Sequence, residues 1–185
     1  EDLVVDMKNA LKNKKSYTKM HNTHIPVNIY NNSPSLDSKC LVIDVGGTGL
    51  KSSLFRFSKD KKLEVVDQFE TIINETEWTS DKFNKYIVNE VDSNFGSKYK
   101  DINTLAYIFS FPGKPQKTKN GIDIISNDSL TKSWHIKGLK DNGPVGKQLL
   151  DKFEFKHKDK IKLLVLNDTV AVIDETFGGI CGTGF

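Results

Sequence analysis

The chain has 185 residues, of which 37% are hydrophobic and 28% charged, and its formal net charge at pH 7 is +3. A chain of this length can bury a substantial core, and the length favours a single domain. This net charge is too small to imply a nucleic-acid partner, and the lysines alternate with acids, as in Asp151-Lys152 and Asp159-Lys160, rather than gather in a stripe. No apolar run approaches the roughly 20 residues of a membrane span. We therefore expect neither a nucleic-acid partner nor a membrane span.

The sequence contains two cysteines, Cys40 and Cys181. They could form one disulfide, but they do not make the disulfide framework of a small secreted domain, so we expect a reducing, cytoplasmic location. The sequence begins at Glu1 rather than at a methionine, and it ends at Gly184-Phe185 within an apparent glycine turn. We therefore expect the chain to be part of a longer protein.

The first 39 residues predict a helix and a connector. An amphipathic helix is predicted over residues 2–20, since apolar residues recur at three- and four-residue spacing. These residues are Leu3, Val4, Met7 and Leu11. Residues 21–39 are rich in Asn, Ser and Pro, which predicts an extended connector.

A three-stranded meander is predicted next. Residues 40–45 form a short apolar run typical of a buried strand, and a glycine-rich turn follows at 46–49. Residues 50–57 alternate in polarity and predict a second strand. Residues 63–69 predict a third strand after the charged turn 58–61.

Helices and strands alternate in the rest of the chain. A helix is predicted over 79–95, with Thr79 or Ser80 as its cap and Gly96 at its end. Further predictions are buried strands at 104–109 and 161–166, helices at 145–155 and 169–177, and a loop-rich segment at 114–141 with a hairpin through 121–125. The resulting order, βββ, α, β, α, β, α, indicates an α/β fold with a mixed sheet.

The first motif suited to chemistry is Asp44-Val45-Gly46-Gly47-Thr48-Gly49, at a turn between two predicted strands. Adjacent glycines let the backbone approach an anion, and a carboxylate at a strand end can hold hydrated magnesium beside phosphates. The motif is not a Walker loop, because it lacks Gly-Lys-Ser/Thr and leads into a strand. A glycine hairpin that binds no ligand explains the same residues equally well.

The second motif is Asn167-Asp168-Thr169, at the C-terminal end of a predicted buried strand. Ligands of α/β sheets gather outside such strand ends. Asp168 could therefore accept a proton from a substrate hydroxyl, while Asn167 could bond to a neighbouring hydroxyl. Asn, Asp and Thr are also the preferred N-cap residues of helices, and this motif alone favours a cap.

Two weaker motifs complete the set. Phe109-Ser110-Phe111-Pro112-Gly113 follows another predicted strand; Pro-Gly is usually a turn, but this one would emerge at the same sheet edge as the first two motifs. Gly182-Thr183-Gly184 could present backbone N–H groups to a second phosphate, although such short glycine motifs are common.

Together these motifs resemble the sugar-kinase branch of the superfamily shared by actin, heat-shock chaperones and hexokinases. Residues 41–57 resemble the first phosphate motif of hexokinases and of the bacterial repressor, open-reading-frame and kinase family. Residues 109–113 combine the hexokinase Phe-Ser-Phe-Pro with the bacterial Pro-Gly. Residues 163–170 resemble the segment with the sugar-binding Asn and the catalytic Asp, and 180–185 resemble the start of a second phosphate motif. The resemblance implies a ribonuclease H-like, actin-like ATPase fold.

The resemblance also implies ATP-dependent phosphorylation of a hexose, with glucose and its 6-hydroxyl favoured. Asp168 would be the general base, Asn167 and Ser110 would contact the sugar, and Asp44 would organise Mg²⁺ through water. The ATP phosphates would contact two groups of residues, namely Gly46, Gly47 and Thr48 from one lobe and Gly182, Thr183 and Gly184 from the other.

A further sugar-contacting loop has two interpretations. Residues 133–139 resemble the hexokinase segment Trp-Thr-Lys-Gly-Phe with one extra residue, so that Lys137 would keep a sugar contact and Ile136 would replace the sugar-contacting Thr. The loop matches bacterial glucokinases equally well, in which case Asn127 or Ser133 would serve instead. If the loop binds no ligand, Lys137 is simply a charged residue on the protein surface.

The resemblance divides the chain into an N-terminal helix and connector at 1–39, a small α/β lobe at 40–176 and the start of a larger lobe at 177–185. The family's sugar-binding glutamates and adenosine pocket would lie beyond Phe185. We therefore expect this chain alone to bind ATP poorly and to turn over negligibly. Its implied partners are a hexose, a nucleotide and the C-terminal lobe of the same protein, while a homodimer and polyphosphate as the phosphoryl donor both stay open.

Two other functions stay open from the sequence. A catalytically silent sugar-sensing homologue would keep the fold, but it has no need of a base at Asp168. An actin- or chaperone-like ATPase would share the first phosphate turn, but it does not explain Phe-Ser-Phe-Pro at 109–112 or Asn-Asp-Thr-Val at 167–170.

Overall fold

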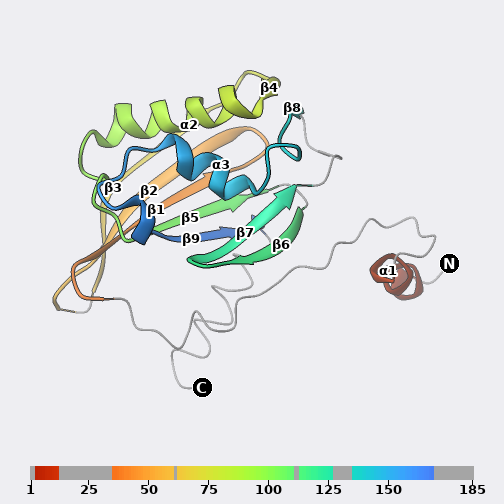
Figure 1. Cartoon of the computed structure of the whole chain (residues 1–185), viewed down its shortest axis with the longest axis horizontal. Helices are drawn as coiled ribbons and strands as arrows, with labels where there is room; N and C mark the ends of the chain where they lie inside the picture. The colour runs from red at the N-terminus through yellow and green to blue at the C-terminus, as the bar shows by residue number, and fades with distance from the viewer. Residues whose placement is uncertain (1–2, 13–34, 61, 111–112, 127–134, 169–185) are drawn as a thin grey trace.

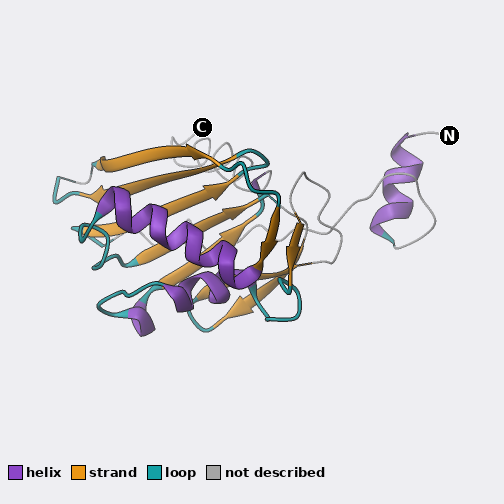
Figure 2. Cartoon of the chain, turned by 90° about the horizontal axis from the view of Figure 1, so that it is seen from above, coloured by secondary structure: helices purple, strands orange, loops and turns teal. Residues whose placement is uncertain are grey.

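The body of the protein is a seven-stranded mixed sheet with two helices packed on one face (Figures 1 and 2). The computed structural model describes residues 3–12, 35–60, 62–110, 113–126 and 135–168. Within these residues no helix combines the length and apolar character needed to cross a membrane. The predicted helix at 169–177 and the predicted lobe start at 177–185 lie outside the described residues.

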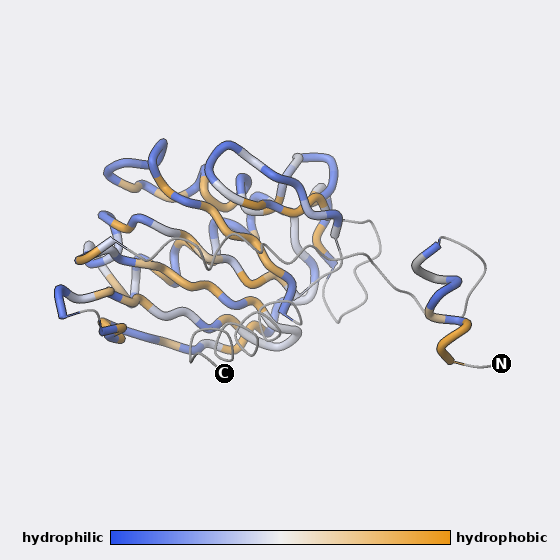
Figure 3. The backbone as a smooth tube through the Cα atoms, turned by 90° about the horizontal axis from the view of Figure 1, so that it is seen from below, coloured by the Kyte–Doolittle hydropathy of each residue, from blue (hydrophilic) through white to orange (hydrophobic). Residues whose placement is uncertain are grey.

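The first half of the sheet is the predicted meander, in which β1 pairs antiparallel with β2 and β2 antiparallel with β3. Its strands are β1 (Ser38–Val45), β2 (Gly49–Phe57) and β3 (Leu63–Ile72). The predicted connector was too long at its C-terminal end, because Ser38 and Lys39 already pair with β2. Figure 3 shows that hydrophobic residues recur along the strands, in keeping with a sheet that buries one face.

The second half of the sheet continues from β1 through parallel pairing. The order across the sheet is β3-β2-β1-β5-β9-β7-β6, in which β1, β5, β9 and β7 run parallel and β6 closes the edge as the hairpin partner of β7. The added strands are β5 (Thr104–Phe109), β6 (Gly113–Thr118), β7 (Gly121–Ser126) and β9 (Lys162–Leu166). The predicted buried strands and the predicted hairpin are confirmed.

Helix α2 (Ser80–Phe95) covers the sheet and has the predicted ends. The Thr79 hydroxyl accepts the Lys82 N–H at 3.3 Å, and Gly96, at φ 58°, donates its N–H to the Asp92 carbonyl. The buried face of the helix recurs at helical spacing and comprises Phe83, Ile87, Val88, Val91 and Phe95. Burying each such side chain contributes about 1.5–3 kcal/mol, so this face anchors the helix to the sheet.

Helix α3 (Val145–Lys152) is shorter than the predicted helix at 145–155. The chain leaves the helix at Phe153, whose backbone is extended at φ −77° and ψ 147°. The rings of Phe153 and Phe155 stack with centroids 4.8 Å apart, and both pack edge-on against Tyr99. Their apolar side chains thus belong to an aromatic cluster rather than to a helical face.

A second, two-stranded sheet was not predicted. It pairs β4 (Glu77–Thr79) with β8 (His135–Lys137) in parallel. The region predicted as loop-rich, 114–141, therefore contains β6, β7 and β8. At the N-terminus, α1 (Leu3–Leu11) confirms the start of the predicted helix, and residues 13–34 lie outside the described part.

An ion-pair network joins the two helices that cover the sheet. Asp81, in the first turn of α2, accepts from Lys152 of α3 at 2.6 Å and pairs with Lys85 of its own helix at 2.8 Å. Two hydrogen bonds, the larger contribution from Lys152 and the smaller from Lys85, lower the pKa of Asp81 to about 2. Because the folded pKa lies below the unfolded value, ionised Asp81 stabilises the fold above the unfolded pKa of an aspartate.

Asp81→Asn should therefore lower the thermal unfolding midpoint at neutral pH, and the difference from wild type should shrink as the pH falls from about 4 towards 2. The loss should be smaller in a Lys152→Gln background, because the partner on α3 is already absent. Unfolding midpoints of the four proteins across pH measure both effects. An equal loss in both backgrounds, or at every pH, would show that Asp81 does not couple the helices.

Candidate active site

Three parallel strands end together at one edge of the sheet. Asp44 of β1 pairs in register with Ile108 of β5, and Ile108 pairs with Leu166 of β9. The residues that follow these positions therefore leave the sheet side by side, as the ends of β5 and β9 do in Figure 1. The parallel register thus brings together the strand ends that the sequence analysis predicted to converge.

Four predicted site residues lie at this edge. Asp44 is half-buried near the end of β1, Ser110 is buried directly after β5, and Asn167 and Asp168 are half-buried directly after β9. The Asn167 side-chain amide reaches the neighbouring strand and donates to the Phe109 carbonyl at 3.5 Å. This bond links the end of β9 to the residue that precedes Ser110.

The alternative, that one residue of Asn167-Asp168-Thr169 caps a helix, depends on residues from Thr169 onward, which lie outside the described part of the chain. Asp168 itself follows β9 by a single intervening residue, Asn167. Its place at the strand end suits both a catalytic base and a cap, so its catalytic role stays a prediction.

The backbone of the predicted phosphate turn is held by hydrogen bonds, and part of the turn is exposed. Gly46 donates its N–H to the Gly49 carbonyl at 3.0 Å, and Ile73 donates its N–H to the Thr48 carbonyl at 3.1 Å. Thr48 is exposed, and Gly46 and Gly47 are half-buried. A backbone held in this way can present its surface to an anion without first having to be ordered.

The two glycines at the ends of the turn have different surroundings. A Cβ added to Gly49 would lie 2.9 Å from the Thr71 carbonyl oxygen on β3, so a side chain there would push the two strands apart. Among the described residues, a Cβ added to Gly46 would meet only the Gly49 carbonyl oxygen, at the ordinary contact distance of 3.9 Å. Packing against β3 therefore requires a glycine at position 49, whereas the described residues leave room for a methyl group at position 46.

The predicted sugar-contacting loop is described only in part. Lys137 is exposed on β8, in register with Thr79 of β4, at the end of the molecule toward which β5 and β7 point (Figure 1). Ile136, at the position of the expected sugar-contacting Thr, is 4% exposed and belongs to the core. The alternatives Asn127 and Ser133 lie outside the described residues, as do the predicted phosphate-binding residues Gly182, Thr183 and Gly184.

Comparison with protein families matches residues 1–175 to the hexokinase family. The chain belongs to this family. Among solved structures, a hexokinase from Schistosoma mansoni complexed with glucose superposes with a TM-score of 0.53, at 20% identity over 85% of this chain. A second hexokinase crystal structure superposes with a TM-score of 0.52, at 18% identity over 75% of this chain. Both confirm the predicted mixed α/β fold of the hexokinases. No curated protein sequence matches.

The chain spans only about a third of these hexokinases, since the matches cover 34% and 33% of their lengths. The candidate site in this chain therefore consists of the strand ends and the glycine turn described above. Among the described residues, no three or more His, Cys, Asp or Glu side chains gather as a metal site. Hydrated Mg²⁺ needs only one or two carboxylates when a nucleotide supplies the other ligands, and Asp44 beside the glycine turn fits that requirement.

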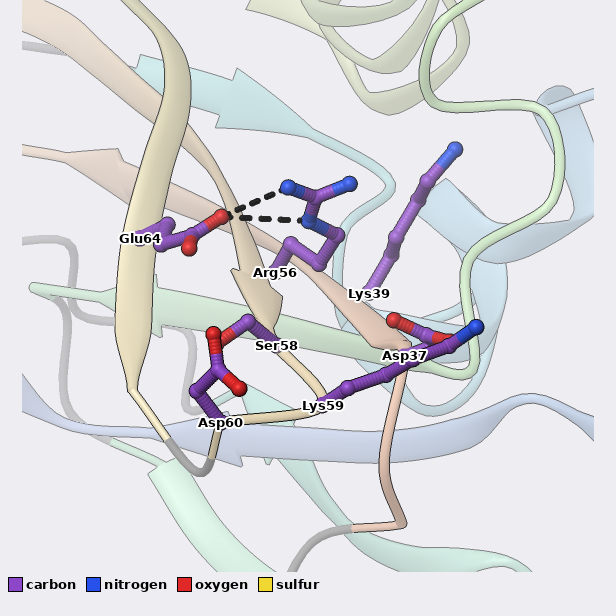
Figure 4. A pocket seen from close by; sticks show the side chains of 7 residues that line it. All are labelled: Asp37, Lys39, Arg56, Ser58, Lys59, Asp60 and Glu64. Carbon is purple, nitrogen blue, oxygen red and sulfur yellow. Dashed lines mark hydrogen bonds and ion pairs between the residues drawn. The ribbon is translucent and has the colours of Figure 1, made fainter.

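A cavity of about 510 Å³ lies at the other end of the strands, beside the start of β1 and the end of β2 (Figure 4). Its lining residues are Asp37, Lys39, Arg56, Ser58, Lys59, Asp60 and Glu64. The charges largely compensate one another: Arg56 lies 2.7 Å from Glu64, and Lys59 lies 3.6 Å from Asp37. The cavity contains none of the predicted site residues, so we assign it no part in the chemistry.

The contrast between the two turn glycines generates a prediction. Gly49→Ala should lower the free energy of unfolding by about 1–3 kcal/mol, the usual cost of overpacking, while Gly46→Ala should leave it close to wild type. In the full-length protein, Gly46→Ala should still weaken ATP binding if Gly46 contacts a phosphate as the sequence predicts, because the added methyl group would take up the space of that contact. Chemical denaturation and calorimetric titration with ATP separate the two effects. Equal destabilisation by both substitutions, or wild-type ATP affinity in Gly46→Ala, would contradict this division.

Proposed function

We propose that the full-length protein transfers the terminal phosphoryl group of ATP to the 6-hydroxyl of glucose. The observation that carries the proposal is the aligned register of β1, β5 and β9, which gathers Asp44, Ser110 and Asp168 at one sheet edge in a chain of the hexokinase family. The glucose-bound hexokinase from Schistosoma mansoni supports glucose as the substrate. Membership of the hexokinase family favours this function over an actin- or chaperone-like ATPase.

In this proposal the sugar lies outside the ends of β5 and β9. Asp168 takes the proton from the 6-hydroxyl oxygen, which makes that oxygen a better nucleophile. Asn167 and Ser110 hold neighbouring hydroxyls, and the bond from Asn167 to the Phe109 carbonyl keeps the Asn167 amide group at the β5 end. Holding the hydroxyl in line with the phosphoryl group supplies much of the acceleration.

The phosphate side of the proposed site belongs to the β1–β2 turn. The backbone of Gly46 and Gly47, together with Thr48, would contact the ATP phosphates, and Asp44 would hold the hydration shell of Mg²⁺. Bound Mg²⁺ supplies charge neutralisation at the phosphates. The exposed ammonium group of Lys137 is the proposed additional sugar contact. Gly182, Thr183 and Gly184 would complete the phosphate contacts from the second lobe.

Asp168→Ala in the full-length protein tests the proposed base. Turnover should fall by about 10²–10⁴-fold, the usual contribution of general base catalysis, while glucose binding stays within a few-fold of wild type. Coupled measurement of ADP release gives kcat, and calorimetric titration gives the glucose affinity.

Asp141→Ala is the matched control, because Asp141 is an exposed carboxylate in a surface turn of the same lobe. It should keep wild-type turnover. A wild-type rate in Asp168→Ala would refute the base assignment, and a wild-type protein that binds glucose but never phosphorylates it would identify a sugar sensor instead.

A further inference from the structure

A fully buried carboxylate lies in β7, the strand that pairs with β9, which the proposed base Asp168 follows. Asp123 has no exposed surface, although charged side chains are almost never fully buried unless they are paired. One carboxylate oxygen, Oδ1, accepts the N–H groups of Ile124 and Gly146, both at 2.7 Å. The other, Oδ2, accepts the N–H of Lys147 at 2.8 Å. Three backbone donors thus replace the water that the carboxylate lost on burial.

Two of these donors belong to the first turn of α3, which lacks a cap of its own. The N-cap position is Pro144, and it makes no side-chain capping bond. The first N–H groups of a helix have no partner inside the helix, and the positive end of the helix dipole favours an anion beside them. Asp123 meets both needs from another strand, so it acts as a distant N-cap of α3.

The first turn of α3 also packs directly against β9. A Cβ added to Gly146 would come within 2.2 Å of Val165 Cγ2 and 3.1 Å of Leu163 Cδ2. The α3 backbone therefore lies against these two β9 side chains with no room for even a methyl group. Since β7 also pairs with β9 through Ile122 and Leu164, the carboxylate connects two elements that both touch β9.

The pKa of Asp123 reflects burial opposed by its donors. Burial raises the pKa of the Asp123 carboxyl, whereas the three backbone N–H groups and the nearby Lys147 oppose that shift. Burial also raises the pKa of Tyr107 on β5, and the negative charge of Asp123 raises it further. The carboxylate is therefore held at a buried junction of α3, β5 and β7 by backbone N–H groups.

We propose that Asp123 is a positioning residue of the active site. Its carboxylate clamps the start of α3 onto β9 and so fixes the point at which Asn167 and Asp168 leave the sheet. Val165, which touches Gly146, lies only two residues before Asn167. The effect on turnover rests on the proposed function, whereas the clamp itself is a property of the fold.

Hydrogen exchange of the full-length protein tests the clamp without any assay of activity. The probe variant is Asp123→Asn, which keeps the size of the side chain but replaces one acceptor oxygen with a donor. Backbone amides of 165–168 should exchange about tenfold faster than global destabilisation explains, as expected for the loss of a hydrogen bond to a charged group. Faster exchange confined to Gly146 and Lys147 would show a purely local cap and would overturn the proposal.

Asp151→Asn is the matched control, because Asp151 is an exposed carboxylate on the same helix, 2.6 Å from the Lys147 ammonium group. Its exchange at 165–168 should match wild type. If Asp123→Asn does not fold, Gly146→Ala replaces it, since the added methyl group would crowd both Val165 on β9 and, at 2.9 Å, Oδ1 of Asp123, and so disturbs the same junction of α3 and β9. Wild-type exchange at 165–168 in Gly146→Ala would also count against the clamp.

Turnover then separates positioning from stability. At a temperature at which the variant stays folded, Asp123→Asn should lower kcat by about tenfold and leave the KM for ATP nearly unchanged, because misplacement of the base affects the chemical step. An unchanged kcat would show that Asp123 only stabilises the fold. If the wild-type protein phosphorylates no sugar, the proposed function fails, and the exchange measurement alone still decides whether the clamp exists.

Discussion

The parallel register of β1, β5 and β9 is the constraint on which the rest of the structure depends. It places Asp44, Ile108 and Leu166 in one row, so that the residues after them leave the sheet together. A two-residue shift in either pairing would move a strand end by about 7 Å. A shift between β1 and β5 would separate Asp44 from Ser110, and a shift between β5 and β9 would separate Ser110 from Asn167 and Asp168. The convergence of these residues in a chain of the hexokinase family is thus a consequence of strand pairing.

The two covering helices stabilise that register in different ways. Helix α2 buries a continuous apolar face and is capped locally by Thr79. Helix α3 is short and amphipathic, and its start depends on Asp123, which lies on a strand. The ion pair between Asp81 and Lys152 adds a surface link between the helices. The apolar face of α2 thus anchors one helix by burial, whereas backbone hydrogen bonds to a buried carboxylate hold the start of the other.

Much of the fold could be predicted because its central strands are continuous apolar runs and α2 has a clear cap at each end. The short strands of the β4–β8 pair could not, because three residues carry no periodicity. The predicted α3 was too long because Phe153 continues the four-residue spacing of Val145 and Leu149, although Phe153 and Phe155 pack on Tyr99. The convergence of Asp44, Ser110 and Asp168 was predictable from strand ends. The distant cap was not, because Asp123 and Gly146 are 23 residues apart, and its only signal was an acid within the apolar run at 122–125.

The central claim is that this sheet edge directs phosphate from ATP to a sugar hydroxyl rather than to water. The most direct test follows ADP and sugar phosphate together in the full-length protein, with glucose, with 6-deoxyglucose and without sugar. The account predicts that glucose yields ADP and glucose 6-phosphate in equal amounts, while 6-deoxyglucose, which lacks the accepting hydroxyl, yields neither above the sugar-free rate. ADP release at the same rate under all three conditions would contradict it.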